Sequence, residues 1–250
     1  MNSKLLLLAC LVATALPACT FQTSHDPPPK ELPKPSTDFP TNKIYPSTSA
    51  QDDGKTMTVF AALLADGKFL QLGSTDKLSA KIAGGPDLAL VSQGETYDPH
   101  YVVTVPSTPD ALDVVISLDR AGTADDAKVA LKVPAAFDLD GSLPSDLKQG
   151  VAFEVGVSPP AKKDDSLWWA VLEGDCISAS STAIATITPA GKLSLTYGAN
   201  TLKANGAASC KVNVKVEHIL SGKADAAFTQ PYPIDAIGVR HRTFVATIAK

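Results

Sequence analysis

The stretch that decides the fold is Leu112-Asp113-Val114-Val115-Ile116-Ser117-Leu118-Asp119. Every even-numbered position in it is apolar, and three of its four odd-numbered positions are polar. An alternation with a period of two predicts a β-strand that buries one face and exposes the other. The same alternation recurs in Leu78-Ser79-Ala80-Lys81-Ile82 and in Val129-Ala130-Leu131-Lys132-Val133. These segments predict strands of one β-rich fold.

Further candidate strands lie on both sides of this stretch, and turn signals such as Asp66-Gly67 and Gly84-Gly85-Pro86 separate them. From residue 54 onward, apolar residues do not recur at helical spacing. We therefore expect an all-β fold. The further candidates are Met57–Leu64, Lys68–Leu72, Leu88–Val91, Tyr101–Val105, Val151–Val157, Leu167–Glu173, Ala183–Thr188, Lys192–Tyr197, Lys211–His218 and Thr243–Ile248.

The strands fall into two series, with a break near Val133-Pro134-Ala135-Ala136. About seven short strands per hundred residues resemble an immunoglobulin-like or fibronectin-like β-sandwich. The resemblance implies two tandem sandwiches, an N-terminal one over residues 54–135 and a C-terminal one over residues 136–250. One larger sandwich or barrel is the alternative, because all-β domains can exceed 200 residues.

The N-terminus has the three zones of an export signal. A polar start, Met1–Lys4, is followed by the apolar run Leu5–Leu16 and by Leu16-Pro17-Ala18-Cys19. The run is too short to span a bilayer as a helix, which takes roughly 20 residues, and it fits the apolar part of a secretory signal. The last four residues resemble the lipobox of bacterial prolipoproteins.

The lipobox resemblance implies that residues 1–18 are removed as a signal peptide and that Cys19 carries lipid, such as palmitate. Thr20, rather than Asp, follows the cysteine, and in enteric members of that family this implies an outer-membrane location in the cell envelope. The alternative is an ordinary signal peptide cut near Ala18, which leaves Cys19 as a free thiol.

Residues 19–53 have the composition of a disordered linker. Apolar residues are sparse there, and such a segment cannot bury enough surface to offset its ordering entropy. An extended proline-rich chain of this length reaches up to roughly 100 Å from the lipid. The prolines are Pro27, Pro28, Pro29, Pro33, Pro35, Pro40 and Pro46.

Charge and composition argue against nucleic acid as a partner. The formal net charge is −4, no basic patch is visible, and the chain has only three arginines, Arg120, Arg240 and Arg242. No second long apolar stretch follows the signal. Lipid on Cys19 is therefore the expected contact with a membrane.

Two cysteines, Cys176 and Cys210, remain after the signal and the lipid site are set aside. In an exported protein this number predicts a disulfide. The expected strands Leu167–Cys176 and Cys210–His218 are neighbours in an immunoglobulin-like sheet, so the bridge joins adjacent strands. If the bridge faces the core, Trp168 faces it too and Trp169 points outward.

Trp169 and Tyr232 are the candidate binding residues. Trp169 has Leu167 and Val171 on the same expected face, and an apolar outer face indicates a contact with a sugar or a partner protein, or packing against the rest of the chain. Tyr232 lies between two prolines in the long connection from Leu220 to Val239. Long connections are commonly functional, although Phe228 and Ile234 could instead close the core.

Metal sites and catalytic motifs are not expected. The acidic stretches Asp138-Leu139-Asp140 and Asp125-Asp126 lack the ligand spacing of an EF-hand. No Gly-x-Ser-x-Gly or His-Glu-x-x-His motif occurs. The histidines are scattered, and His241, between two arginines, is expected at a solvated strand start. No cofactor is indicated.

Together these features predict a non-enzymatic, lipid-anchored envelope protein whose β-sandwiches bind an envelope protein or a glycan. A passive envelope spacer is the first alternative. An enzyme whose active site assembles only in three dimensions is the second.

Overall fold

The computed structural model of the chain describes residues 31–121, 126–140, 151–162, 166–174, 181–196, 209–229 and 236–249. Within them, the regular structure consists of β-strands and two 3-10 turns, η1 (Ser36–Asp38) and η2 (Thr41–Lys43). The predicted all-β fold is confirmed, and every strand predicted from the period-two alternation overlaps an observed strand.

The strands have the following bounds: β1 Lys34–Pro35, β2 Tyr45–Asp52, β3 Thr56–Ala65, β4 Lys68–Gln71, β5 Asp76–Ile82, β6 Asp87–Ala89, β7 Val91–Gln93, β8 His100–Pro106, β9 Leu112–Arg120, β10 Ala127–Val133, β11 Asp138–Asp140, β12 Phe153–Ser158, β13 Leu167–Glu173, β14 Ser181–Ile184, β15 Thr186–Ile187, β16 Leu193–Leu195, β17 Ser209–Ser221, β18 Lys223–Ala224 and β19 Ala236–Ala249.

A first hydrophobic core lies between two sheets. One sheet has the order β18-β10-β9-β5-β6, and the other contains β4, β3, β2 and β19, with β8 also paired to β3. The even-numbered residues of β9 point into this core, since Val114 and Ile116 are almost fully buried there together with Val59 of β3. The alternation that defines β9 in the sequence is therefore the alternation between core and solvent.

A second hydrophobic core lies between β13, β17 and β19 on one side and the sheet β11-β12-β16-β15 on the other. Trp168, Ala170 and Leu172 of β13 are buried in it, next to Val214 of β17. The predicted face assignment of β13 is thus correct for the described residues.

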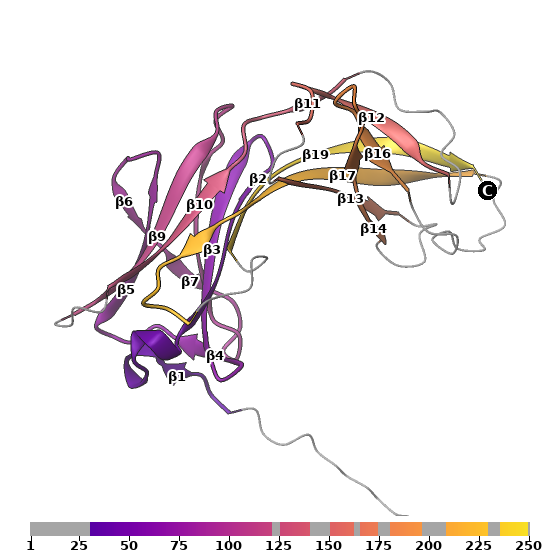
Figure 1. Cartoon of the computed structure of the whole chain (residues 1–250). Coiled ribbons are helices and arrows are strands. Elements are labelled where there is room, and N and C mark those ends of the chain that lie inside the picture. Colours follow the sequence, from indigo (N-terminus) through magenta and orange to yellow (C-terminus); the bar gives the residue numbers. More distant parts are fainter. Residues whose placement is uncertain are drawn as a thin grey trace, which may run out of the picture. The chain divides into compact units, whose positions relative to one another are not determined.

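β19, one of the two longest strands, contributes to both cores. It pairs antiparallel with β17, the other long strand (Figure 1), from Ser209↔Ala249 to Ser221↔Ile237. Ala236 of β19 lies in the first core and Ala246 in the second. Ala224 and Phe228, which the sequence assigns to the C-terminal segment 136–250, also pack in the first core.

The predicted linker over residues 19–53 is wrong for its second half. β2 pairs antiparallel with β3 and parallel with β19, and Ile44 just before it is fully buried. The small side chains of Ser47, Thr48 and Ser49 carry little apolar signal. Backbone hydrogen bonds on both sides hold this strand in the sheet, and composition does not reveal them.

Arg120 fixes the segment that precedes β2. Its guanidinium lies 3.5 Å from Asp76 and donates to the carbonyl oxygens of Phe39 (2.8 Å) and Ser36 (3.0 Å). The Ser36 hydroxyl completes the network by donating to Asp76 at 2.7 Å. Since Arg120 and Asp76 are buried, this network holds the chain against the first core from Ser36 onward.

Candidate functional site

The outward face of β13 carries the predicted binding residue Trp169. Its side chain is half-buried and lies opposite the core residues Trp168 and Ala170. Leu167 and Val171 share this outward face, and Leu167 is 36% exposed. The structure therefore places an apolar strip on the face that sequence analysis predicts.

Three other strands bring further side chains into line with Trp169. Trp169 lies opposite Ile184 on β14 and opposite Glu217 on β17, and Glu217 lies opposite His241 on β19. Directly opposed residues of antiparallel strands project on the same side of a sheet. Ile184, Trp169, Glu217 and His241 therefore form one row across the sheet, which we call the Trp169 row.

The two ends of the Trp169 row have different character. Ile184 at one end is 64% exposed, and Val245, four residues beyond His241 on the same face of β19, is 63% exposed. Single exposed aliphatic residues are ordinary, but Ile184 lies directly opposite a half-buried tryptophan on one sheet face. This arrangement offers apolar contact area around a charged centre.

The charged centre is an ion pair between Lys215 and Glu217. The Lys215 Nζ atom lies 2.7 Å from a Glu217 carboxylate oxygen, and the Glu217 side chain is only 13% exposed. Lys215 belongs to the same face because it is two residues from Glu217 on β17. The pair places one hydrogen-bond donor group and one acceptor group beside Trp169.

His241 is half-buried, so its predicted position at a solvated strand start is wrong. Burial lowers the pKa of His241 below its ordinary value of 6.5, the positive charge of Lys215 lowers it further, and Glu217 opposes both effects. The imidazole is therefore neutral at neutral pH. Its Nδ1 atom is buried and has no hydrogen-bond partner among the described residues.

The indole Nε1 atom of Trp169 is also buried, and no described residue accepts a hydrogen bond from it. Buried polar atoms in folded proteins are normally paired with protein or water. Trp169 and His241 thus each carry a buried polar atom that no described residue pairs with.

The edge of the sheet adjoins the Trp169 row. β14 ends the strand order beyond β13, and within the described part of the chain no strand pairs with its other side. An unpaired strand edge offers backbone donors and acceptors to an added strand. The exposed Ile184 lies on this edge strand.

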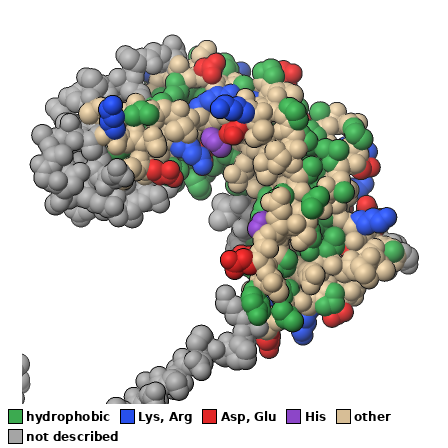
Figure 2. All heavy atoms as spheres, turned by 180° about the vertical axis from the view of Figure 1, so that it is seen from behind, with side chains coloured by type: hydrophobic (Ala, Val, Ile, Leu, Met, Phe, Trp, Pro, Cys, Tyr) green, Lys and Arg blue, Asp and Glu red, His purple; other side chains and the backbone are tan. Residues whose placement is uncertain are grey.

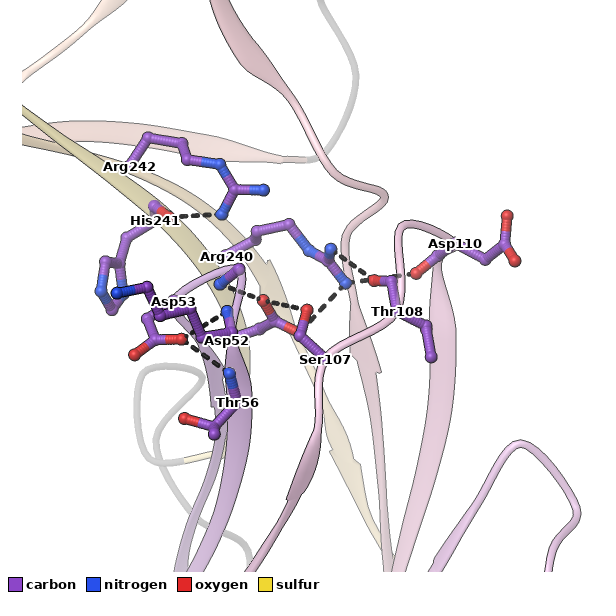
Figure 3. A network of polar contacts seen from close by, with 11 residues as sticks. Asp52, Asp53, Thr56, Ser107, Thr108, Asp110, Arg240, His241 and Arg242 are labelled. Atoms are coloured by element: carbon purple, nitrogen blue, oxygen red, sulfur yellow. Dashed lines mark hydrogen bonds and ion pairs between the residues drawn. The ribbon is translucent and has the colours of Figure 1, made fainter.

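A buried network holds β19 in place just before His241 (Figure 3). The Arg240 guanidinium lies 3.4 Å from the Asp52 carboxylate, and it donates to the carbonyl oxygens of Thr108 and Asp110 at 2.7 and 3.2 Å. Ser107 donates its hydroxyl to Asp52. The network anchors the inward residue next to His241, and so sets where the outward imidazole projects.

The side chains of the other predicted site residues lie outside the described part of the structure. Cys19, Cys176 and Tyr232 lie outside the described residues. Cys210 lies in β17, opposite Ile248 of β19, but its side chain is among those not described. The lipid site, the disulfide and the Tyr232 contact therefore stay predictions.

The sequence did not point to Glu217 and His241 as companions of Trp169. Glu217 is 48 positions and His241 is 72 positions from Trp169 in the chain, so no local pattern joins them. The one available signal was the pairing of the last two predicted strands. Pairing them in register would have set Glu217 beside His241.

The described residues show neither a metal-ligating cluster nor a membrane-spanning helix. They contain no group of three or more His, Cys, Asp or Glu side chains arranged to hold a metal ion. They contain no helix long and apolar enough to cross a membrane.

Comparisons with known proteins add little beyond this geometry. No family model and no curated protein matches the chain. Among solved structures it is similar to the I-band fragment I67–I69 of titin, with 12% identity, a TM-score of 0.27, and coverage of 82% of this chain and 64% of that one. The titin Z1Z2 domains in complex with telethonin match at 10% identity and a TM-score of 0.25, over 85% of this chain and 100% of that one.

Proposed function

We propose that this chain is a non-enzymatic lipoprotein of the cell envelope that binds a protein partner through the face centred on Trp169. The observation that carries the proposal is the Trp169 row, in which a half-buried tryptophan lies beside the exposed Ile184 and shares its outward face with Leu167. Aromatic residues surrounded by apolar contacts are the usual centres of protein interfaces.

A protein partner is favoured over a glycan by the sheet edge beside the row. β14 exposes backbone groups that an added strand can pair with, and Ile184 projects from it into the contact face. A sugar would need several hydrogen-bonding side chains around the indole. Here Lys215 and Glu217 are already paired with each other.

The lipid anchor rests on the lipobox resemblance at Cys19. The first described strand, β1, starts at Lys34, and a connection from Cys19 to Lys34 spans at most about 50 Å. This is about half the reach that the predicted linker allowed.

A pull-down from intact envelopes tests the proposed contact. Wild-type protein is compared with Trp169→Ala, and Val91→Ala serves as the control because Val91 is an apolar residue, 63% exposed, on β7, outside the Trp169 row. We expect Trp169→Ala to lose at least one partner protein that Val91→Ala keeps. The same partner set for all three proteins would favour the passive spacer.

A glycan ligand is tested in the same material. If glycosidase treatment of the envelopes abolishes capture while the captured proteins remain soluble and intact, the partner is a glycan. In that case the face stands but the protein partner is wrong.

A further inference from the structure

A hollow lies on the sheet that contains β2, β3, β4 and β8, on the side that faces away from the first core. The core side of β3 carries Met57, Val59 and Leu63, which are all buried. The opposite side carries Phe60, Ala62 and Leu64. β3 thus has apolar side chains on both faces, although only one face contributes to the core.

Cross-strand pairing extends this outer face over neighbouring strands. Leu64 lies opposite Tyr45 of β2 and opposite Phe69 of β4, so these three side chains form a second row. Phe60 stacks in a tilted geometry with His100 of β8, with ring centroids 5.1 Å apart. Between them is a hollow of about 400 Å³. It is lined by Tyr45, Ser47, Phe60, Ala62, Leu64, Phe69, Asp98 and His100.

The hollow combines aromatic walls with one acidic group. Of the described residues that line it, Asp98 is the one with a carboxylate side chain. Its side chain is exposed, and no described residue forms an ion pair or hydrogen bond with its carboxylate. The negative charge at the rim is therefore not neutralised by the described part of the protein.

Aromatic rings and a carboxylate around one hollow favour a cation. The face of an aromatic ring attracts a cation through its quadrupole, and quaternary ammonium groups are bound in this way by cages of several rings. The volume lies within the range of small-ligand sites. Polar lining groups are few, which disfavours a primary ammonium or a sugar because both need several hydrogen-bond partners.

We propose that this hollow binds a quaternary ammonium group, of the kind carried by choline and glycine betaine. Tyr45, Phe60 and Phe69 supply ring contacts, and the Asp98 carboxylate supplies the opposite charge. The site is separate from the Trp169 row, so it does not depend on the proposed partner contact.

Titration with choline and tetramethylammonium tests the site on the full mature chain, with binding followed by calorimetry and by ligand-observed NMR. The control ligand is the neutral alcohol in which a tert-butyl group replaces the trimethylammonium group of choline. We expect both cations to bind and the isosteric alcohol to bind much more weakly. Equal binding of the alcohol, or binding of glucose in place of the cations, would overturn the proposal.

Two variants test the residues. Phe60→Leu keeps the apolar character but removes a ring, and we expect it to weaken choline binding roughly three- to thirtyfold. Asp98→Asn removes the charge with little change in shape, and we expect a loss of about fivefold. The matched control is Asp119→Asn, at an exposed acid on β9, which should bind choline as the wild type does.

Trp169→Ala should also keep wild-type choline binding, which separates this site from the proposed partner face. Thermal unfolding of each variant shows that it is folded. If Phe60→Leu and Asp98→Asn are folded and bind choline unchanged, the proposal is wrong.

The natural source of the ammonium group is decided by competition. Displacement of choline by phosphatidylcholine vesicles, but not by phosphatidylglycerol vesicles, identifies a lipid headgroup as the ligand. Choline binding that neither kind of vesicle disturbs identifies a small soluble ligand. Both outcomes support a quaternary ammonium site.

Discussion

Arg240 and Asp52 form an ion pair in which both side chains are fully buried, with the Arg240 Nη2 atom 3.4 Å from a carboxylate oxygen of Asp52. The two residues are also partners in the parallel pairing of β19 with β2. Burial lowers the pKa of Arg240 and the negative charge of Asp52 raises it. The guanidinium nevertheless stays protonated, because its ordinary pKa lies far above neutrality.

Breaking this pair should destabilise the fold strongly. Arg240→Met leaves a buried carboxylate without its cation, and we expect the free energy of unfolding to fall by about 3–5 kcal/mol. Chemical denaturation measures the change. The control is Lys81→Met, which breaks the exposed Lys81–Asp87 pair and should cost less than about 1 kcal/mol.

A double-mutant cycle separates the pair from other effects of the Arg240 substitution. Asp52→Asn should cost less in the Arg240→Met background than in the wild type, because the charges are coupled. Additive losses would mean that the two side chains stabilise the fold independently.

The disulfide predicted between Cys176 and Cys210 should contribute to stability. We expect Cys176→Ser to lower the free energy of unfolding by about 2–4 kcal/mol, a typical disulfide contribution. Thiol titration of the oxidised, denatured wild type should detect neither cysteine.

Treatment with a reducing agent provides the control for the predicted disulfide. Reduction should destabilise the wild type and leave the doubly substituted Cys176→Ser, Cys210→Ser variant unchanged. Two titratable thiols in the oxidised wild type would contradict the bridge.

His241 should make stability depend on pH. Its pKa is below the ordinary 6.5 in the folded state, so the unfolded chain takes up the proton first. The contribution is therefore intact above that ordinary value and is lost as pH falls through the folded pKa. Thermal unfolding across this range should show a loss of stability that His241→Gln lacks.

Lys215→Met provides a second test of the same group. Removing the cation raises the pKa of His241 toward its ordinary value, since Lys215 lowers it, and should shrink the pH dependence. An unchanged profile in both variants would show that another group titrates.

The lipid anchor predicts a simple labelling result. Cys19→Ala should abolish metabolic labelling with palmitate and move the protein from the membrane to the soluble envelope fraction, because two acyl chains are needed for stable anchoring. Cys210→Ser, at a cysteine expected in the folded part, should keep the label. Continued labelling of Cys19→Ala would exclude the anchor.

Local pattern was enough to predict most strands. In β9, apolar side chains alternate with mostly polar ones, and a strand can satisfy that alternation only by placing one set inside. The residues of β13 from Leu167 to Leu172 are all apolar, so its two faces were predicted only through the expected disulfide. β2 escaped prediction because Pro46, Ser47 and Thr48 resemble a linker in composition. Its place in the sheet comes from backbone pairing with β3 and β19.

The sequence by itself determined that the chain is all-β and where most strands begin and end. These follow from residues close together in the chain. Tertiary structure alone decided that Glu217 and His241 join Trp169, that Asp52 meets Arg240, and that Phe69 and Asp98 share a hollow. Such contacts depend on which strands pair and in what register, and that choice is made by the packing of the whole sheet.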